Sequence, residues 1–196
     1  VTHCNILVLP CLYELAKNRC HFIAENQQYN NPKSKLDGAY LIYDNEEKHI
    51  YYNREYDFNG GRERVGMGVL IAKYLQNHDD EVLLNSLKKY IKYVQKNLVC
   101  IETGEVFNDC NYDNSFTRLY NYPWFSLFYI ELYKLLRDKN MLEIAYKIML
   151  FFYNQGGEHF YAIEVPIVKL VECLRESGMT DMADNMICLL YTSDAA

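Results

Sequence analysis

The feature that most constrains the fold is an alternation between two kinds of helical segment. In residues 65–76, apolar side chains form two stripes at helical spacing, one containing Leu70 and one containing Val69. In residues 81–98, apolar side chains form a single stripe and lysines fill the opposite face. A helix that is apolar on all sides must be buried, whereas a helix with one polar face lies at the surface. The pattern therefore predicts hairpins of one inner and one outer helix.

The same alternation recurs along the chain at irregular spacing. Two-layered helical hairpins of this kind form toroids and solenoids, so the predicted fold class is all-α, an incomplete (α/α) toroid of about four helical hairpins. Residues 30–64 form an insertion, in which alternating apolar residues predict a small β-hairpin near 39–52, and a further short strand is expected at 105–107. The predicted inner helices are 5–16, 65–76, 122–136 and 163–174, and the predicted outer helices are 19–28, 81–98, 140–153 and 180–187.

Composition excludes several classes of protein. The 196 residues carry a net charge of −6 with no basic stripe, so binding to nucleic-acid phosphates is not expected. The apolar stretches are interrupted before the length of a membrane span. The 7 cysteines form no C-x-x-C pair, and no histidine stands at metal-ligand spacing. We therefore predict neither a disulfide framework nor a metal or other cofactor, and the cysteine usage favours a cytoplasmic location.

The two ends of the chain suggest that it is part of a longer protein. The chain begins with Val1 rather than Met, so a signal peptide in the parent protein is not assessable. The last residues, 188–196, resemble a translated adapter of the kind used to prepare sequencing libraries. We expect residues 1–187 to form a partial (α/α)6-toroid domain from environmental sequence, residues 188–196 to be an adapter-derived tail, and the remainder of the toroid to be missing from this chain.

Polar and aromatic residues collect just before the predicted inner helices, in residues 54–64, 113–122 and 155–161 and at His3. If the inner helices are parallel, these clusters open on one rim, at the positive ends of the helix dipoles. Paired carboxylates there can act as acid and base, and arginines can pair with a uronate carboxylate. Tyrosine rings can stack on sugars and bond their hydroxyls. The rim is therefore the predicted sugar site.

Each cluster also has a purely structural interpretation. Glu63 between two arginines is equally well explained as a salt-bridge node at a helix start, and Asp113 as a turn or cap residue. An isolated His159 is more often a hydrogen-bonded loop residue than a catalyst. We interpret Trp124 as part of the core, and the glycines of residues 66–68 as permitting two helices to approach closely.

The chain resembles the six-hairpin glycosidase superfamily. The resemblance is carried by its paired helices and by residues 54–68, 118–124 and 156–163. The resemblance spans about residues 3–187, and it implies an (α/α)6 toroid that hydrolyses glycosidic bonds with a pair of acidic residues. No family motif is matched at a single position, so the candidates are positional. We expect Asp57 to be the leading acid/base, with Glu63 or Asp113 as its partner. The expected substrate-binding residues are Arg62, Arg64, Arg118, Tyr120, Tyr122, Glu158, His159, Tyr161 and His3.

The predicted function is that of a carbohydrate-active enzyme, a glycoside hydrolase acting on polysaccharide-derived oligosaccharides, including uronate-containing ones. The expected partner is an oligosaccharide substrate, without nucleic acid or membrane. One alternative is a toroid-type polysaccharide lyase, in which His159 and Tyr161 abstract a proton and Arg118 neutralises the uronate carboxylate. The other is a non-catalytic helical-repeat scaffold that binds peptide. The irregular spacing and fully apolar inner helices rank the scaffold third.

Overall fold

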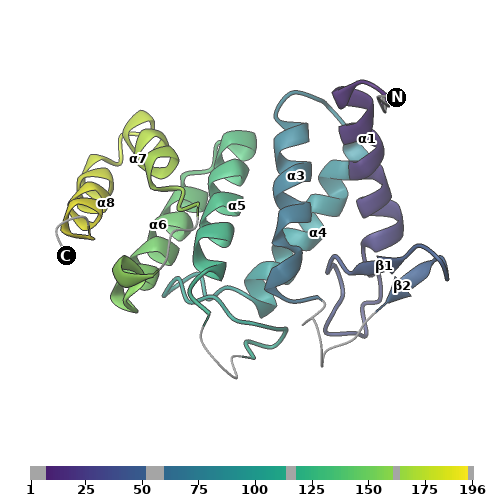
Figure 1. Ribbon diagram of the computed structural model, residues 1–196, viewed down its shortest axis with the longest axis horizontal. Coiled ribbons are helices and arrows are strands. Elements are labelled where there is room, and N and C mark those ends of the chain that lie inside the picture. Colours follow the sequence, from purple (N-terminus) through teal and green to yellow (C-terminus); the bar gives the residue numbers. More distant parts are fainter. Residues whose placement is uncertain (1–7, 52–59, 114–117, 161–163, 194–196) are drawn as a thin grey trace, which may run out of the picture.

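The fold is mostly helical and forms part of a helical toroid, which confirms the predicted fold class (Figure 1). The structure, a computed structural model, describes residues 8–51, 60–113, 118–160 and 164–193. Helical hairpins follow one another within these residues. Their helices are α3 (Val65–Leu75) with α4 (Glu81–Asn97), α5 (Asn121–Leu136) with α6 (Lys139–Asn154), and α7 (Ile167–Glu176) with α8 (Thr180–Ser193).

The hairpins form an inner and an outer layer, as the alternation of apolar patterns predicts. Inner helix α3 packs against α5, and α5 packs against α7, while each outer helix packs against its own inner partner. Helix α5 is buried along most of its length, including Phe125, Phe128 and Tyr129. The boundaries of α3, α4, α5 and α6 lie within one residue of the predicted ones. Helix α8 continues past Ile187 to Ser193, into the segment expected to be an adapter-derived tail.

The first predicted hairpin is replaced by a single helix, so this part of the prediction is wrong. Helix α1 (Leu12–Phe22) continues directly into the π-helical turn η1 (Ile23–Gln27), with no break between the predicted inner and outer segments. Pro10 lies inside the predicted inner helix, and proline disfavours a helical conformation at the residue before it. The helix therefore begins only after Pro10. Pro166 has the same effect on α7, which begins at Ile167 rather than at residue 163.

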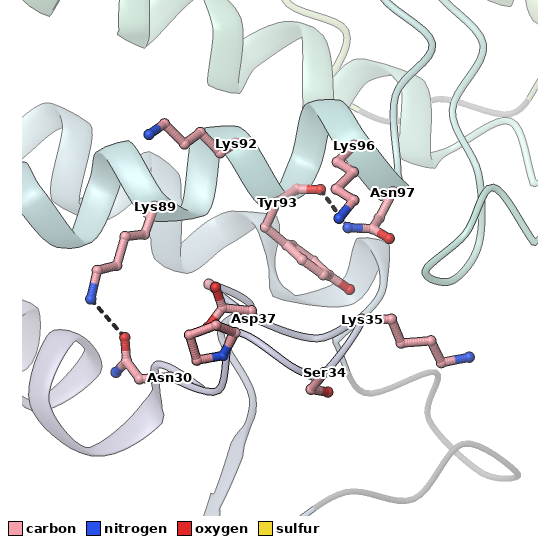
Figure 2. A pocket seen from close by; sticks show the side chains of 11 residues that line it. Asn30, Ser34, Lys35, Asp37, Lys89, Lys92, Tyr93, Lys96 and Asn97 are labelled. Carbon is pink, nitrogen blue, oxygen red and sulfur yellow. Dashed lines mark hydrogen bonds between the residues drawn. The ribbon is translucent and has the colours of Figure 1, made fainter.

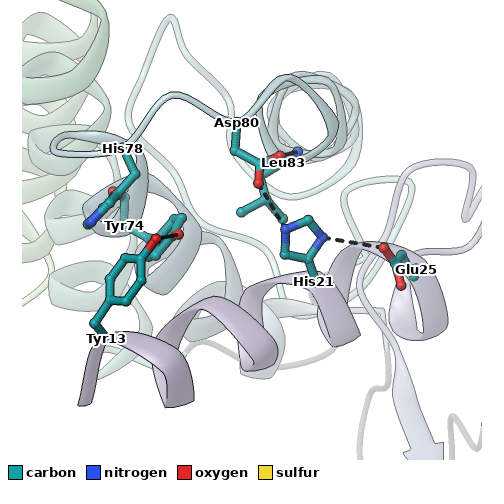
Figure 3. A network of polar contacts seen from close by, with 7 residues as sticks. All are labelled: Tyr13, His21, Glu25, Tyr74, His78, Asp80 and Leu83. Carbon is teal, nitrogen blue, oxygen red and sulfur yellow. Dashed lines mark hydrogen bonds and ion pairs between the residues drawn. The ribbon is translucent and has the colours of Figure 1, made fainter. Parts of the chain in front are cut away.

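Polar and aromatic side chains connect helix α1 to the end of α3 and to the start of α4 (Figure 3). The rings of Tyr13 and Tyr74 lie 6.1 Å apart between centroids. The Nε2 atom of His21 lies 2.8 Å from Asp80 Oδ2, and its Nδ1 lies 3.3 Å from Glu25 Oε1. Asp80 also caps α4, because its Oδ1 accepts a hydrogen bond from the Leu83 backbone N–H at 3.1 Å. Asp80 thus connects two helices.

Replacing Asp80 by alanine is expected to lower the free energy of unfolding by about 1 kcal/mol, because the cap and the His21 contact are both lost. Burial opposes ionisation of Asp80, but the Leu83 N–H and the His21 ring outweigh it and lower the carboxyl pKa. A lowered folded-state pKa stabilises the protein above the unfolded pKa of about 3.9 and ceases to do so as the pH falls through the folded value. Urea unfolding across the acidic range should therefore show a shallower pH dependence for Asp80→Ala than for the wild type; equal slopes would contradict this.

The insertion before α3 forms the expected β-hairpin and is anchored on α4. Strands β1 (Ile42–Asp44) and β2 (His49–Tyr51) pair antiparallel with Tyr43 opposite Ile50. The Tyr40 ring is buried against Tyr90 at 4.3 Å between centroids, and the Tyr40 and Ser86 hydroxyl oxygens lie 3.0 Å apart. The strand expected at 105–107 is reduced to an isolated bridge between Val99 and Val106.

None of the helices in the described part of the chain is both long enough and apolar enough to cross a membrane.

Candidate functional site

The starts of α3 and α5 lie side by side at one end of the inner layer (Figure 1). The 3-10 turn η2 (Arg62–Arg64) leads directly into α3. A cavity of about 280 Å³ opens between the first turns of the two helices, and we call it the α3–α5 groove. The residues that line the groove are Glu63, Val65, Gly66, Val69, Trp124 and Leu127.

Glu63 is the polar residue that lines this groove, and Arg118 and Tyr120 lie beside the lining, in contact with Glu63 and Trp124 respectively. Arg118 Nη1 lies 3.7 Å from Glu63 Oε1 and donates a hydrogen bond to the Tyr120 hydroxyl. The Arg118 guanidinium carbon lies 5.7 Å from the centroid of the Tyr120 ring. The Glu63 and Arg118 side chains are 24% and 35% exposed, so a solute can reach them. The structure therefore brings together three of the predicted site residues from two separate sequence clusters.

The apolar part of the groove is dominated by Trp124, which our sequence interpretation assigned wrongly to the core. Trp124 is 38% exposed, and its ring lies 5.3 Å from that of Tyr120 between centroids. The spacing of four residues was the signal available in the sequence, because it places both rings on the same side of the first turn of α5. Exposed aromatic faces with polar groups at one end are suited to binding the apolar face of a sugar ring.

The two glycines of α3 have different roles. A Cβ atom on Gly68 would lie 2.7 Å from the Tyr90 ring and 2.8 Å from the Phe128 ring, so Gly68 permits α3 to approach α4 and α5 closely. A Cβ atom on Gly66 would meet nothing within 4 Å, and Gly66 lines the groove. The close approach predicted from these glycines therefore applies to Gly68, whereas Gly66 keeps the groove open.

Replacing Gly66 by leucine is expected to fill the groove without destabilising the fold. Leucine has a helix propensity about 0.8–1 kcal/mol better than glycine, and the space around Gly66 is empty, so the free energy of unfolding should not fall. Binding of an oligosaccharide in the groove should weaken by about tenfold or more, since the new side chain takes its place. As a matched control, Gly68→Ala should destabilise the protein by about 1–3 kcal/mol through overpacking. Unchanged binding by a folded Gly66→Leu variant would exclude the groove as a sugar site.

Arg62 is not placed where it could bind a substrate in this structure. Its side chain is 0% exposed, and its backbone N–H and Nη1 donate to the Asn108 carbonyl at 3.3 and 3.4 Å. Its Nη2 lies 3.3 Å from Glu63 Oε1. Arg62 therefore fixes the loop before α5 to the start of α3 and holds Glu63 from the buried side. Arg64 is only partly exposed. Its positive charge lowers the pKa of the Tyr90 hydroxyl, although burial, which is the larger effect, raises that pKa overall.

Tyr122 is likewise a packing residue in this structure, in contrast to its expected role as a sugar contact. Its ring is fully buried and stacks on Phe151 with 5.5 Å between the centroids. Burial raises the pKa of the Tyr122 hydroxyl to about 12. Tyr122 follows Tyr120 by two residues, and on a helix this spacing turns the two rings to different sides.

Asp113, Glu158 and His159 are not among the residues that line the groove. Asp113 lies in the loop before α5, where it forms a backbone bridge with Asp109. Glu158 and His159 lie on the 3-10 turn η3 (Gly157–His159), with 3.6 Å between Glu158 Oε1 and His159 Nε2. This turn packs against α6 and α8. The predicted site residues that lie outside the described residues are Asp57, His3 and Tyr161.

No group of three or more His, Cys, Asp or Glu side chains that could hold a metal ion is found among the described residues.

The fold matches that of a protein of known structure. No protein-family model and no curated protein sequence matches the chain. A solved structure of a polysaccharide lyase, BACCELL_00875, is 33% identical with a TM-score of 0.87, over 95% of this chain. This chain spans 28% of the length of that lyase. The chain therefore has the fold of part of a carbohydrate-active enzyme, whereas membership of the six-hairpin glycosidase superfamily stays a prediction.

Proposed function

We propose that this chain forms part of an enzyme that cleaves a uronate-containing polysaccharide by β-elimination. The observation that carries the proposal is the hydrogen-bonded pair of Arg118 and Tyr120, which contacts the groove-lining residues Glu63 and Trp124. The likeness to a polysaccharide lyase over nearly the whole chain supports the same reaction class.

The two polar side chains match the requirements of β-elimination. The reaction removes the proton on the carbon next to the uronate carboxylate, and the electron pair of that C–H bond becomes a carbon–carbon double bond. The glycosidic C–O bond breaks at the same time, and the departing oxygen leaves with its electron pair and takes up a proton. Tyr120 is the proposed base, and Arg118 would neutralise the carboxylate and stabilise negative charge on the phenolic oxygen. Trp124 would hold the sugar ring.

Hydrolysis is less well supported by the described residues. A glycoside hydrolase needs two carboxyl groups that flank the scissile bond. Of the three predicted carboxylates, Glu63 lines the groove, Asp113 lies in a neighbouring loop, and Asp57 is outside the described residues. The lyase interpretation also differs from our initial one in its base, because His159 lies on η3 and does not line the groove, and Tyr161 lies outside the described residues.

The test is to incubate the protein with a uronate-containing oligosaccharide and to follow both ultraviolet absorbance and new reducing ends. Elimination yields an unsaturated uronate, so absorbance and reducing ends should rise together. New reducing ends without absorbance would support the hydrolase instead. The absence of both products would contradict enzymatic cleavage of this substrate class.

A further inference from the structure

A second cavity, of about 370 Å³, lies between α4 and the first part of the insertion, residues 30–38 (Figure 2). We call it the lysine pocket. Lys89, Lys92 and Lys96 line it from α4, and Lys35 lines it from the insertion. The α4 lysines are spaced three and four residues apart, so they share one face of the helix. One acidic side chain, Asp37, also lines the pocket.

This concentration of positive charge is unusual in a chain with a net charge of −6. Sequence alone interprets the α4 lysines as a solvated outer face, as expected of most charged helix surfaces. The insertion changes this surface into a walled cavity, since its loop packs beside the helix. Lys89 Nζ donates a hydrogen bond to the Asn30 side chain at 2.8 Å across the cavity. Among the described residues, no carboxylate forms an ion pair with Lys92 or Lys96.

The walls of the pocket are fixed by buried contacts rather than by exposed side chains alone. Tyr93 is 2% exposed, and its hydroxyl donates to the Gly60 carbonyl. Asn97 is also 2% exposed, and its Nδ2 donates to the Tyr93 carbonyl at 3.1 Å. A Cβ atom on Gly38 would lie 2.7 Å from the Lys89 carbonyl oxygen, so the insertion approaches α4 more closely than any other residue would allow. A preorganised pocket loses less entropy when it binds a ligand.

We infer that the lysine pocket binds the carboxylate groups of an acidic saccharide, separately from the α3–α5 groove. Lysine ammonium groups attract anions as point charges. Three of them on one helix face suit a saccharide that carries a carboxylate on successive sugar units. The Tyr93–Gly60 hydrogen bond connects this pocket to the segment that leads into Glu63 and the groove. The assignment of a saccharide rests on the proposed function, whereas the anion preference follows from the pocket itself. Bound saccharide here would hold the polymer on the enzyme between cleavage events.

The test compares binding of a short oligouronate with binding of a neutral oligosaccharide of equal length, by calorimetry. The Lys92→Gln/Lys96→Gln double variant removes two positive charges and keeps polar side chains of similar helix propensity, and it should weaken oligouronate binding by about tenfold. Lys88→Gln is the matched control, because Lys88 is exposed on α4 but does not line the pocket, and it should change affinity by less than about twofold. In about 1 M NaCl, where the screening length is about 3 Å, this contribution should disappear.

The inference is overturned if the double variant binds the oligouronate as tightly as the wild type does, or if Lys88→Gln weakens that binding equally. It is also overturned if the double variant weakens binding of the neutral oligosaccharide as much as binding of the oligouronate. Inorganic phosphate supplies a further arm. If phosphate binds as tightly as the oligouronate, the pocket is a site for a small free anion rather than a saccharide. The Tyr120→Phe variant separates the two proposals, since it should bind oligouronate at the lysine pocket even when it lacks activity.

Discussion

Replacing Tyr120 by phenylalanine is expected to lower kcat on a uronate-containing oligosaccharide by about 100- to 10,000-fold, the range for removal of a general base. The phenylalanine ring retains the contact with Trp124, so KM should change much less than kcat. The loss then belongs to the hydroxyl, which Arg118 contacts directly. The measurement is the initial rate of ultraviolet absorbance as unsaturated product forms.

Tyr112→Phe is a matched control for this variant. Tyr112 is 42% exposed in the loop before α5, and its hydroxyl donates to the Gln95 carbonyl at 2.8 Å, away from the groove-lining residues. Its loss should cost about 1 kcal/mol of stability at most and leave kcat unchanged. If Tyr120→Phe retains most of the wild-type kcat, Tyr120 is not the base and the proposed mechanism fails even if elimination itself is observed.

Much of the helical architecture could be predicted from the sequence because apolar periodicity reports directly which faces of a helix are buried. The amphipathic pattern of α4 and the all-round apolar pattern of α5 placed both helices within one residue of their observed bounds. The errors occurred where one local residue overrides periodicity. Pro10 and Pro166 each lie inside a predicted helix, and each helix begins only after its proline.

The candidate site was predictable only in part, since its residues meet through packing rather than through sequence neighbourhood. The parallel inner helices bring Glu63 together with Arg118 and Tyr120, as the hairpin repeat implies. Periodicity cannot show which apolar residue remains uncovered, and Trp124 is exposed because Gly66 stands on the facing helix. It also cannot show that the polar Arg62 turns inward.

Replacing Arg62 by methionine is expected to lower the free energy of unfolding by about 3 kcal/mol. Arg62 is fully buried, and its guanidinium bonds the Asn108 carbonyl on one side and Glu63 on the other. Methionine fills a similar volume but donates no hydrogen bond, so the buried Asn108 carbonyl loses a charged donor, which typically costs several kcal/mol together with the broken ion pair. For a chain of this size, about 3 kcal/mol corresponds to a melting temperature lower by about 6–12 °C.

The exposed pair of Arg175 and Asp184 offers a matched control for this measurement. Their side chains are 56% and 69% exposed at a separation of 3.4 Å, so Arg175→Met should cost less than about 1 kcal/mol. Urea unfolding followed by circular dichroism measures both variants. Equal losses would mean that Arg62 acts as an ordinary surface charge. A large loss confined to Arg62→Met would instead show that buried contacts of Arg62 stabilise the start of α3. Glu63 lines a groove that is open to solvent, and these buried contacts would then be what fixes its position.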